Sequence, residues 1–140
     1  DQMDIREHLQ ADLIGQATIS ALVTRVYAGM RPQATALPCL VWRCTKVERG
    51  EDLAADTGER LAHFEIVIWA ASLQATLAVK EVIEDLYHGT EGYQFGVTAN
   101  KIEIDSSRLL EEFDGDRVSD TYDENGAFPL TMVFEFMWVE

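Results

Sequence analysis

The hydrophobic period of the sequence changes between residues 63 and 87, and this change limits the folds open to the chain. Residues 63–69 alternate, with Phe64, Ile66 and Ile68 on one side, which is typical of a β-strand. From Leu73 to Tyr87 the apolar residues instead recur at helical spacing. A strand followed at once by an amphipathic helix predicts helices packed on one face of a sheet. We expect the core side of this helix to carry Ala75, Val79, Val82, Ile83 and Leu86.

Similar patterns place the other elements. Asp4 and Glu7 resemble the capping box of a first helix that ends at Gly15, with Ile5, Leu9 and Leu13 as its apolar stripe. We expect a short helix at 18–23, an extended segment at 25–27, and strands at 39–47, 93–105 and 128–138. The predicted class is α+β, a mainly antiparallel sheet of about four strands with helices on one face, in the order α-α-β-β-α-β-β.

The length and the cysteines bear on organisation. The 140 residues predict a single domain over residues 3–140, with Met3 as the natural start and residues 1–2 left over from cloning. We expect no secretory signal and no transmembrane helix. On an extended strand Cys39 and Cys44 would lie about 16 Å apart, too far for a disulfide. Free thiols fit a reducing compartment, so we expect an intracellular protein when it is made.

The charge balance argues against some partners. Asp and Glu number 25 and Lys and Arg 11, a formal net charge of −14. Such a surface disfavours binding to nucleic acid or to an anionic membrane. Two interpretations stay open: the charge serves solubility, or it lines a surface past which DNA slides without sticking.

The sequence has no recognisable catalytic or metal-binding pattern. It lacks the nucleophile, phosphate-loop, dinucleotide and zinc-protease motifs. We interpret His8, His63 and His88 as surface histidines, and the acidic segment 114–126 fails the spacing of a calcium loop in two registers. We therefore expect no enzyme, no cofactor and no metal.

The sheet face opposite the predicted core is unusually apolar. Loop cover or ordinary surface exposure could explain this, and so could a subunit interface, which we favour slightly. We expect Trp69 to matter more for assembly than for folding, and Arg43 to pair with Glu65 or Glu135. The candidate interface residues are Val41, Arg43, Val67, Trp69, Val133 and Met137.

A polar segment, residues 49–60, separates two predicted strands. We expect a long loop that is disordered in the free subunit and orders on assembly. Its candidate residues for a partner or a channel lumen are Glu51, Asp52, Asp56 and Glu59.

Several short motifs together resemble one family. They are Arg25-Val26-Tyr27, Pro32, Leu37-Pro38 at a strand start, and the strand Glu65 to Ala70 before a helix rich in alanine and valine. This pattern resembles the tail terminator proteins of long-tailed phages, which are related to the minor tail protein U type and also occur in prophages and gene transfer agents. The resemblance covers about residues 3–140.

The resemblance implies a structural role in a virion. Such proteins form a ring, usually a hexamer, on the head-proximal end of the tail tube, where they stop polymerisation and present the head-docking surface. The implied partners are further copies of the chain, the tail tube protein and a head-side connector, with DNA passing through the ring. The implied location is the virion tail, after assembly in the host cytoplasm. The alternatives are a head-side connector or adaptor ring and a small acidic ligand-binding domain.

Overall fold

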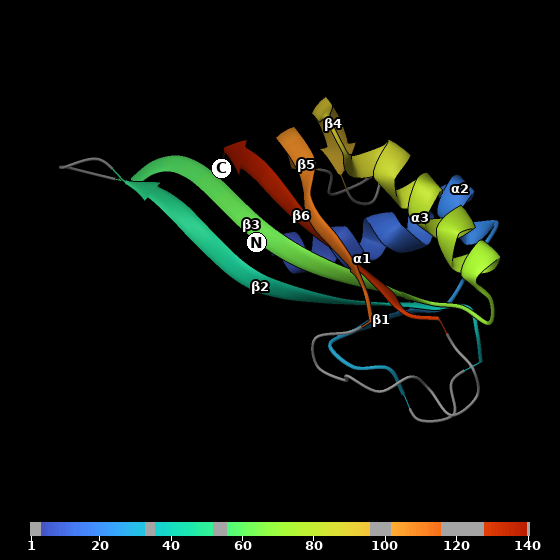
Figure 1. Cartoon of the computed structure of the whole chain (residues 1–140). Coiled ribbons are helices and arrows are strands. Elements are labelled where there is room, and N and C mark those ends of the chain that lie inside the picture. The colour runs from blue at the N-terminus through green and yellow to red at the C-terminus, as the bar shows by residue number, and fades with distance from the viewer. Residues whose placement is uncertain (1–3, 33–35, 52–55, 96–101, 116–127, 140) are drawn as a thin grey trace.

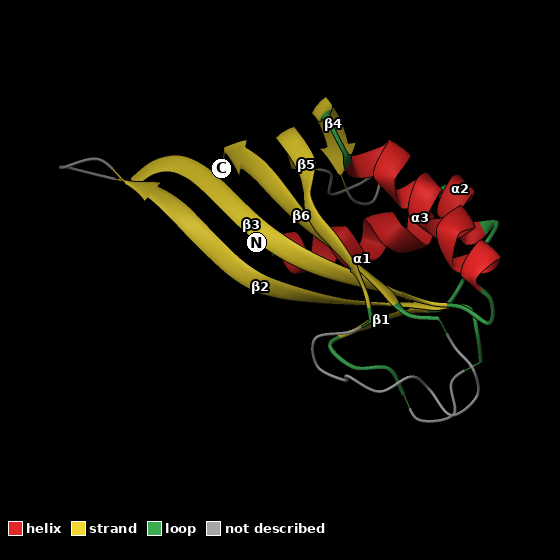
Figure 2. Ribbon diagram, in the orientation of Figure 1, coloured by secondary structure: helices red, strands yellow, loops and turns green. Residues whose placement is uncertain are grey.

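The computed structural model describes residues 4–32, 36–51, 56–95, 102–115 and 128–139 (Figure 1). Its helices are α1 (Ile5–Gly15), α2 (Ala17–Ser20) and α3 (Leu73–Tyr87). Its strands are β1 (Val26–Ala28), β2 (Cys39–Glu51), β3 (Asp56–Trp69), β4 (Thr90–Phe95), β5 (Ile102–Asp114) and β6 (Leu130–Val139). The α+β class is confirmed, with the helices on one side of the sheet (Figure 2).

The sheet has six strands in the order β1-β2-β3-β6-β5-β4, so the expected number of about four is too small. Every pair is antiparallel except β1 with β2. β1 has only three residues, too few for a hydrophobic period. The extended region expected at 93–105 belongs to two strands, β4 and β5. A register irregularity between Leu109 and Glu111 shifts the alternation within β5, which hides this strand in the sequence.

The helices pack on the sheet much as their periodicity predicts. Asp4 caps α1 by accepting a hydrogen bond from the backbone nitrogen of Arg6, and Ile5, Leu9 and Leu13 are buried. In α3, Ser72 is the N-cap and Val79 and Ile83 are buried, whereas the predicted core residue Ala75 is exposed. Thr76 is buried instead, and its hydroxyl is satisfied there by donating to the Phe128 carbonyl oxygen at 2.8 Å.

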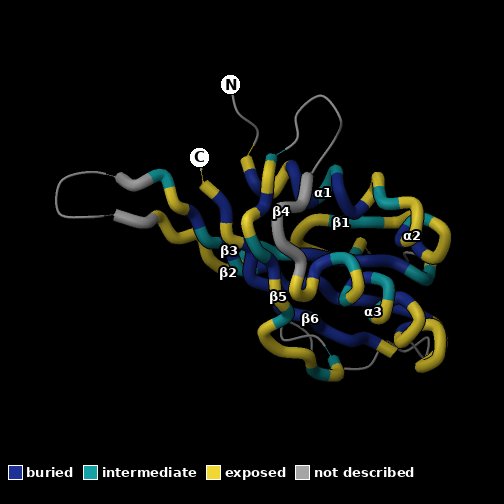
Figure 3. The backbone as a smooth tube through the Cα atoms, turned by 90° about the horizontal axis from the view of Figure 1, so that it is seen from above, coloured by how far each residue is buried: buried dark blue, intermediate teal, exposed yellow. Residues whose placement is uncertain are grey.

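An aromatic group forms the centre of the main core. The rings of Phe64, Phe134, Phe136 and Tyr87 are fully buried and meet largely edge to face. The Tyr87 hydroxyl donates to a carboxylate oxygen of the buried Asp12 at 2.6 Å. This bond joins α3 to α1 across the inner face of the sheet, where the buried segments gather (Figure 3).

β2 and β3 form a long ribbon where we expected a loop. The two strands remain paired as far as Glu51 and Asp56, so the polar segment 49–60 is mainly strand. The neighbouring β6 last pairs with β3 at Val139 and Glu59. We call residues 50–51 and 56–58 the arm, because this part of the ribbon projects past the rest of the sheet (Figure 1). The sequence does not reveal this two-stranded ribbon, because neither face of such a ribbon has to be apolar and its polar residues show no strand periodicity.

Among the described residues no helix is both long and apolar enough to cross a lipid bilayer.

Candidate functional site

The sheet face turned away from α1 and α3, here called the outer face, holds most of the candidate interface residues. Alternation along β2, β3 and β6 places Val41 and Arg43, Val67 and Trp69, and Val133 and Met137 on this face. The structure divides the face into an apolar cluster at one end and a row of ion pairs beside it.

The apolar cluster is covered by the chain itself. It consists of Cys39, Val41, Val67 and Trp69, with at most 5% of any residue exposed. Tyr27 and Leu37 pack against it, and the Arg31 guanidinium lies 4.9 Å from the centre of the Trp69 ring. Cover by the chain, one of the explanations left open by the sequence, therefore applies to these residues, because Tyr27 of β1, Arg31 after it and Leu37 before β2 lie over them.

The other candidates differ in exposure. Val133 is buried, whereas Met137 is 43% exposed near the end of β6. Arg43 is half-buried and its guanidinium donates to Glu65 at 2.6 Å, which selects Glu65 over Glu135 as its partner. A role of these residues in a subunit interface stays a prediction, and Met137 is the candidate that a second chain could reach most easily.

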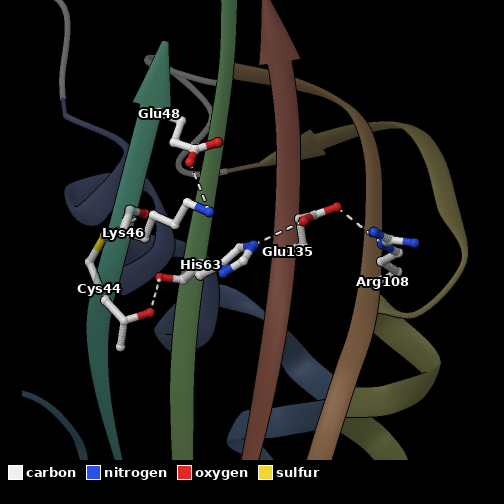
Figure 4. Close-up of polar contacts among 7 residues, drawn as sticks. Cys44, Lys46, Glu48, His63, Arg108 and Glu135 are labelled. Carbon is white, nitrogen blue, oxygen red and sulfur yellow. Dashed lines mark hydrogen bonds and ion pairs between the residues drawn. The ribbon is translucent and has the colours of Figure 1, made fainter. Parts of the chain in front are cut away.

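Ion pairs continue the outer face across three neighbouring strands (Figure 4). His63 of β3 contacts one oxygen of Glu135 of β6 at 2.9 Å, and the Nε of Arg108 of β5 donates to the other oxygen at 3.1 Å. His63 and Arg108 are each the register partner of Glu135, one on either side of it. Both oxygens of a nearly buried carboxylate thus have a partner, as such a group requires.

The surroundings of Glu135 act on its ionisation in opposite directions. Burial raises the pKa of this carboxyl, and the hydrogen bonds and charges of His63 and Arg108 lower it more. The net result is a lowered pKa, so Glu135 is a carboxylate at neutral pH. The charge is balanced locally, which favours a structural role over a proton-transfer role.

The sequence misjudges the settings of two histidines that we interpreted as surface residues. His8 is only 5% exposed on α1, and burial lowers the pKa of its imidazole. His63 lies inside a strand and pairs with Glu135, whereas we expected it at a strand start. The alternation alone puts His63 and Glu135 on the same face, but only the register between β3 and β6 makes them opposite neighbours.

The described acidic candidates lie on strands, whereas we expected them in a loop. Glu51 and Asp56 are register partners within the arm, and Glu59 is exposed opposite Val139. Asp52 lies outside the described residues. Most of the acidic segment 114–126 also lies outside them.

The two free cysteines are where the spacing predicts. Cys39 is buried in the apolar cluster, while Cys44 packs against the main core on the other side of the sheet. Among the described residues no group of histidine, cysteine and acidic side chains could hold a metal ion.

Two cavities open on the described surface. One, of about 430 Å³, lies between α1 and β2 and is lined by Arg6, Glu7, Gln10, Ala11 and Trp42. The other, of about 210 Å³, lies between the start of α3 and the start of β6; Leu73, Thr76, Asp114, Phe128, Pro129 and Leu130 line it.

The fold and the face just described define a small α+β protein with a projecting β-ribbon. No protein-family model and no curated protein sequence matches the chain. Among solved structures, the chain is similar to a chain of the virion of a native gene transfer agent particle, with a TM-score of 0.61 and 14% sequence identity. The match covers 97% of this chain and 92% of that chain. The two chains share a fold over nearly their whole lengths.

Proposed function

We propose that the protein is a structural subunit of a phage-like particle, and more narrowly a tail terminator that forms a ring on the head-proximal end of the tail tube. The observation that carries this proposal is the fold shared end to end with a chain of a gene transfer agent virion. The motifs from Arg25 to Ala70 that resemble tail terminators support the narrower role.

The shape and charge of the chain agree with this role. The arm projects from the sheet, which suits a part that reaches a neighbouring subunit (Figure 1). A net charge of −14 offers DNA no electrostatic attraction, as a ring around passing DNA requires. The proposed partners are further copies of the chain, the tail tube protein and a head-side connector.

Three measurements test the proposal. Sedimentation velocity of the purified protein should give a discrete oligomer, and electron microscopy should find rings on one end of tail tubes of the same particle. Added during polymerisation of the tube protein, the chain should shorten the tubes. A protein that stays monomeric at all concentrations and leaves tube length unchanged would overturn the proposal.

A head-side connector or adaptor ring is the second candidate, because it would also be a small α+β subunit of the same joint. Cross-linking in assembled particles separates the two roles. A terminator should cross-link to the tube protein, whereas an adaptor should cross-link to portal or other head proteins.

A further inference from the structure

One edge of β2 is open over most of the length of the strand. β1 pairs only with residues 40–42, and no other described strand pairs with this edge between Arg43 and the end of β2 at Glu51. We call residues 43–51 the open edge. Residues 45–49 within it are all exposed, and 39% of Val47 is accessible. Unpaired backbone N–H and C=O groups along such an edge are a template for a further strand.

The charged side chains of the open edge are ordered about Val47. Lys46 and Glu48 lie on either side of it, and the Lys46 ammonium contacts the Glu48 carboxylate at 2.8 Å (Figure 4). Lys46 is the register partner of His63, so this pair lies on the outer face, beside the row of ion pairs. Val47 lies on the other face, opposite Ala62. A basic group and an acidic group thus flank one exposed apolar residue.

An antiparallel second copy of β2 fits this order in one register. With a two-fold axis at Val47, Lys46 of each copy lies opposite Glu48 of the other copy, and the two Val47 side chains meet. An axis at Lys46 or at Glu48 would set two like charges opposite each other, which destabilises a sheet.

The length of the open edge selects the same register. Val47 is the midpoint between Arg43 and Glu51, so two open edges overlap from end to end only when the axis lies there. An axis further along the strand shortens the overlap, because β1 occupies the edge before Arg43. The charge order and the position of β1 are separate observations, and both place the axis at Val47.

We propose that two copies of the chain pair antiparallel along their open edges, about a two-fold axis at Val47, and form a dimer with one continuous sheet. Backbone hydrogen bonds supply the contact, and the charges fix its register more than its affinity. The inference goes beyond the proposed function, because a two-fold contact uses the same surface on both copies and does not build a ring by itself. It describes the subunit away from the tail tube.

The local charge favours a second copy as the occupant. The whole chain has a net charge of −14, which keeps copies apart over most of the surface. The open edge instead has a net charge of +1, from Arg43, Lys46, Glu48, Arg49 and Glu51. Two copies therefore approach each other here with little repulsion, and their outer-face ion pairs form one continuous row.

The strand geometry limits the contact to one partner. Register irregularities between Cys44 and Lys46 and between Arg49 and Glu51 leave only the middle of the open edge regular. Such irregularities bend a strand and restrict pairing along it. A short ladder that uses the open edges of both copies ends with the dimer and does not extend into a fibre.

Charge reversal tests the register. In Lys46→Glu and in Glu48→Lys, like charges would face each other across the axis. The double variant Lys46→Glu with Glu48→Lys restores opposite pairs, and so does an equimolar mixture of the two single variants. Glu81→Lys is the matched control for Glu48→Lys, because Glu81 is exposed on α3. Near-ultraviolet circular dichroism checks that each variant stays folded.

Sedimentation velocity over a range of protein concentrations measures the dimer. We expect the wild type and Glu81→Lys to reach twice the 15.7 kDa of one chain. The dissociation constant of each single reversal should rise about tenfold or more, and it should return to the wild-type value in the double variant and in the mixture. The two reversals change the net charge in opposite directions, so a loss of the dimer in both is not an effect of net charge.

Hydrogen exchange locates the contact. The amides of residues 46–48 should exchange more slowly in the dimer than in the diluted subunit. Protection of these amides only after addition of tube protein would assign the open edge to that partner and overturn the inference.

The remaining outcomes separate this inference from the proposed function. A wild type without a dimer, single reversals that dimerise as tightly as the wild type, or a double variant and a mixture that do not recover would each overturn the contact. None of these results concerns rings on tail tubes, which test the proposed function. A wild type that dimerises through the open edge but neither caps nor shortens tail tubes would overturn the proposed function and leave the contact in place.

Discussion

At the level of single residues, burial decides what the outer face can do. Trp69 is 5% exposed beneath Arg31 and Leu37, and Glu135 is 8% exposed between His63 and Arg108. Both residues therefore contribute to the stability of the single chain, whatever further role they have in an assembly.

Substitution of Trp69 distinguishes folding from assembly. We expect Trp69→Ala to lower the free energy of unfolding by about 3–5 kcal/mol, because it leaves a cavity in the apolar cluster. Urea denaturation of the dilute subunit measures this. Leu73→Ala is the control, because an exposed side chain should change stability by about 0.5 kcal/mol or less. A stable Trp69→Ala monomer that fails to assemble would instead restore Trp69 as an interface anchor.

The lowered pKa of Glu135 predicts that the stability of the fold depends on pH. Its pKa is lowered in the folded chain, whereas the pKa of a glutamate in an unfolded chain is about 4.3. The contribution of this group is therefore complete above about pH 4.3 and disappears as the pH falls through the lowered folded value. We expect Glu135→Gln to cost about 1–3 kcal/mol at pH 7 and progressively less at acidic pH.

Denaturation curves of wild type and Glu135→Gln between neutral and acidic pH check this prediction. Glu81→Gln is the matched control, because Glu81 is exposed on α3. A loss of stability at pH 7 that persists unchanged in acid would mean that the ionic contacts of Glu135 do not stabilise the fold.

At the level of the elements, the number of neighbouring strands varies along the β2–β3 ribbon. Near Trp42, β2 is paired with both β1 and β3. In the arm, β2 and β3 pair only with each other among the described strands. An isolated two-stranded ribbon is marginally stable in water. The arm is thus the part of the sheet most dependent on an external partner.

Hydrogen exchange resolves this difference within one strand. In the free subunit we expect the amides of residues 50–51 and 56–58 to exchange much faster than those of residues 40–42, because local opening there breaks fewer contacts. Assembly should slow exchange in the arm and leave residues 40–42 unchanged. Equal protection of the arm in free and assembled protein would mean that it has no partner in the assembly.

At the level of the whole molecule, net charge opposes association. Copies with a charge of −14 repel one another, and salt screens this repulsion within a Debye length of about 10 Å at 0.1 M and about 3 Å at 1 M. We expect the protein concentration at half-assembly to fall several-fold as NaCl is raised from about 0.05 to about 0.5 M.

Sedimentation velocity over a series of salt concentrations measures this effect, with sucrose at matched viscosity as the control. Assembly that weakens steadily with salt would contradict the prediction and would indicate that attractive ion pairs between copies dominate the contact.

Periodicity alone predicts the class of fold and most of the core. Leu9, Phe64 and Ile83 are buried as predicted, because strand and helix patterns depend on a residue's near neighbours in the chain. The two cysteines and the cap at Asp4 follow from local geometry in the same way. The extended segment expected at 25–27 overlaps β1, but three residues carry no periodic signal that would place it in the sheet. The arm was not predicted, because a ribbon without an apolar face leaves no such signal either.

The character of the outer face depended on contacts between residues distant in sequence. Its apolar end is covered because Tyr27 and Leu37 pack against Val67 and Trp69, and its ionic row exists because the strand register sets His63 beside Glu135. Alternation assigns a side chain to a face, but it does not say what covers that face or which strand lies opposite. Chain topology decides both, because covering and pairing join segments that share no local pattern.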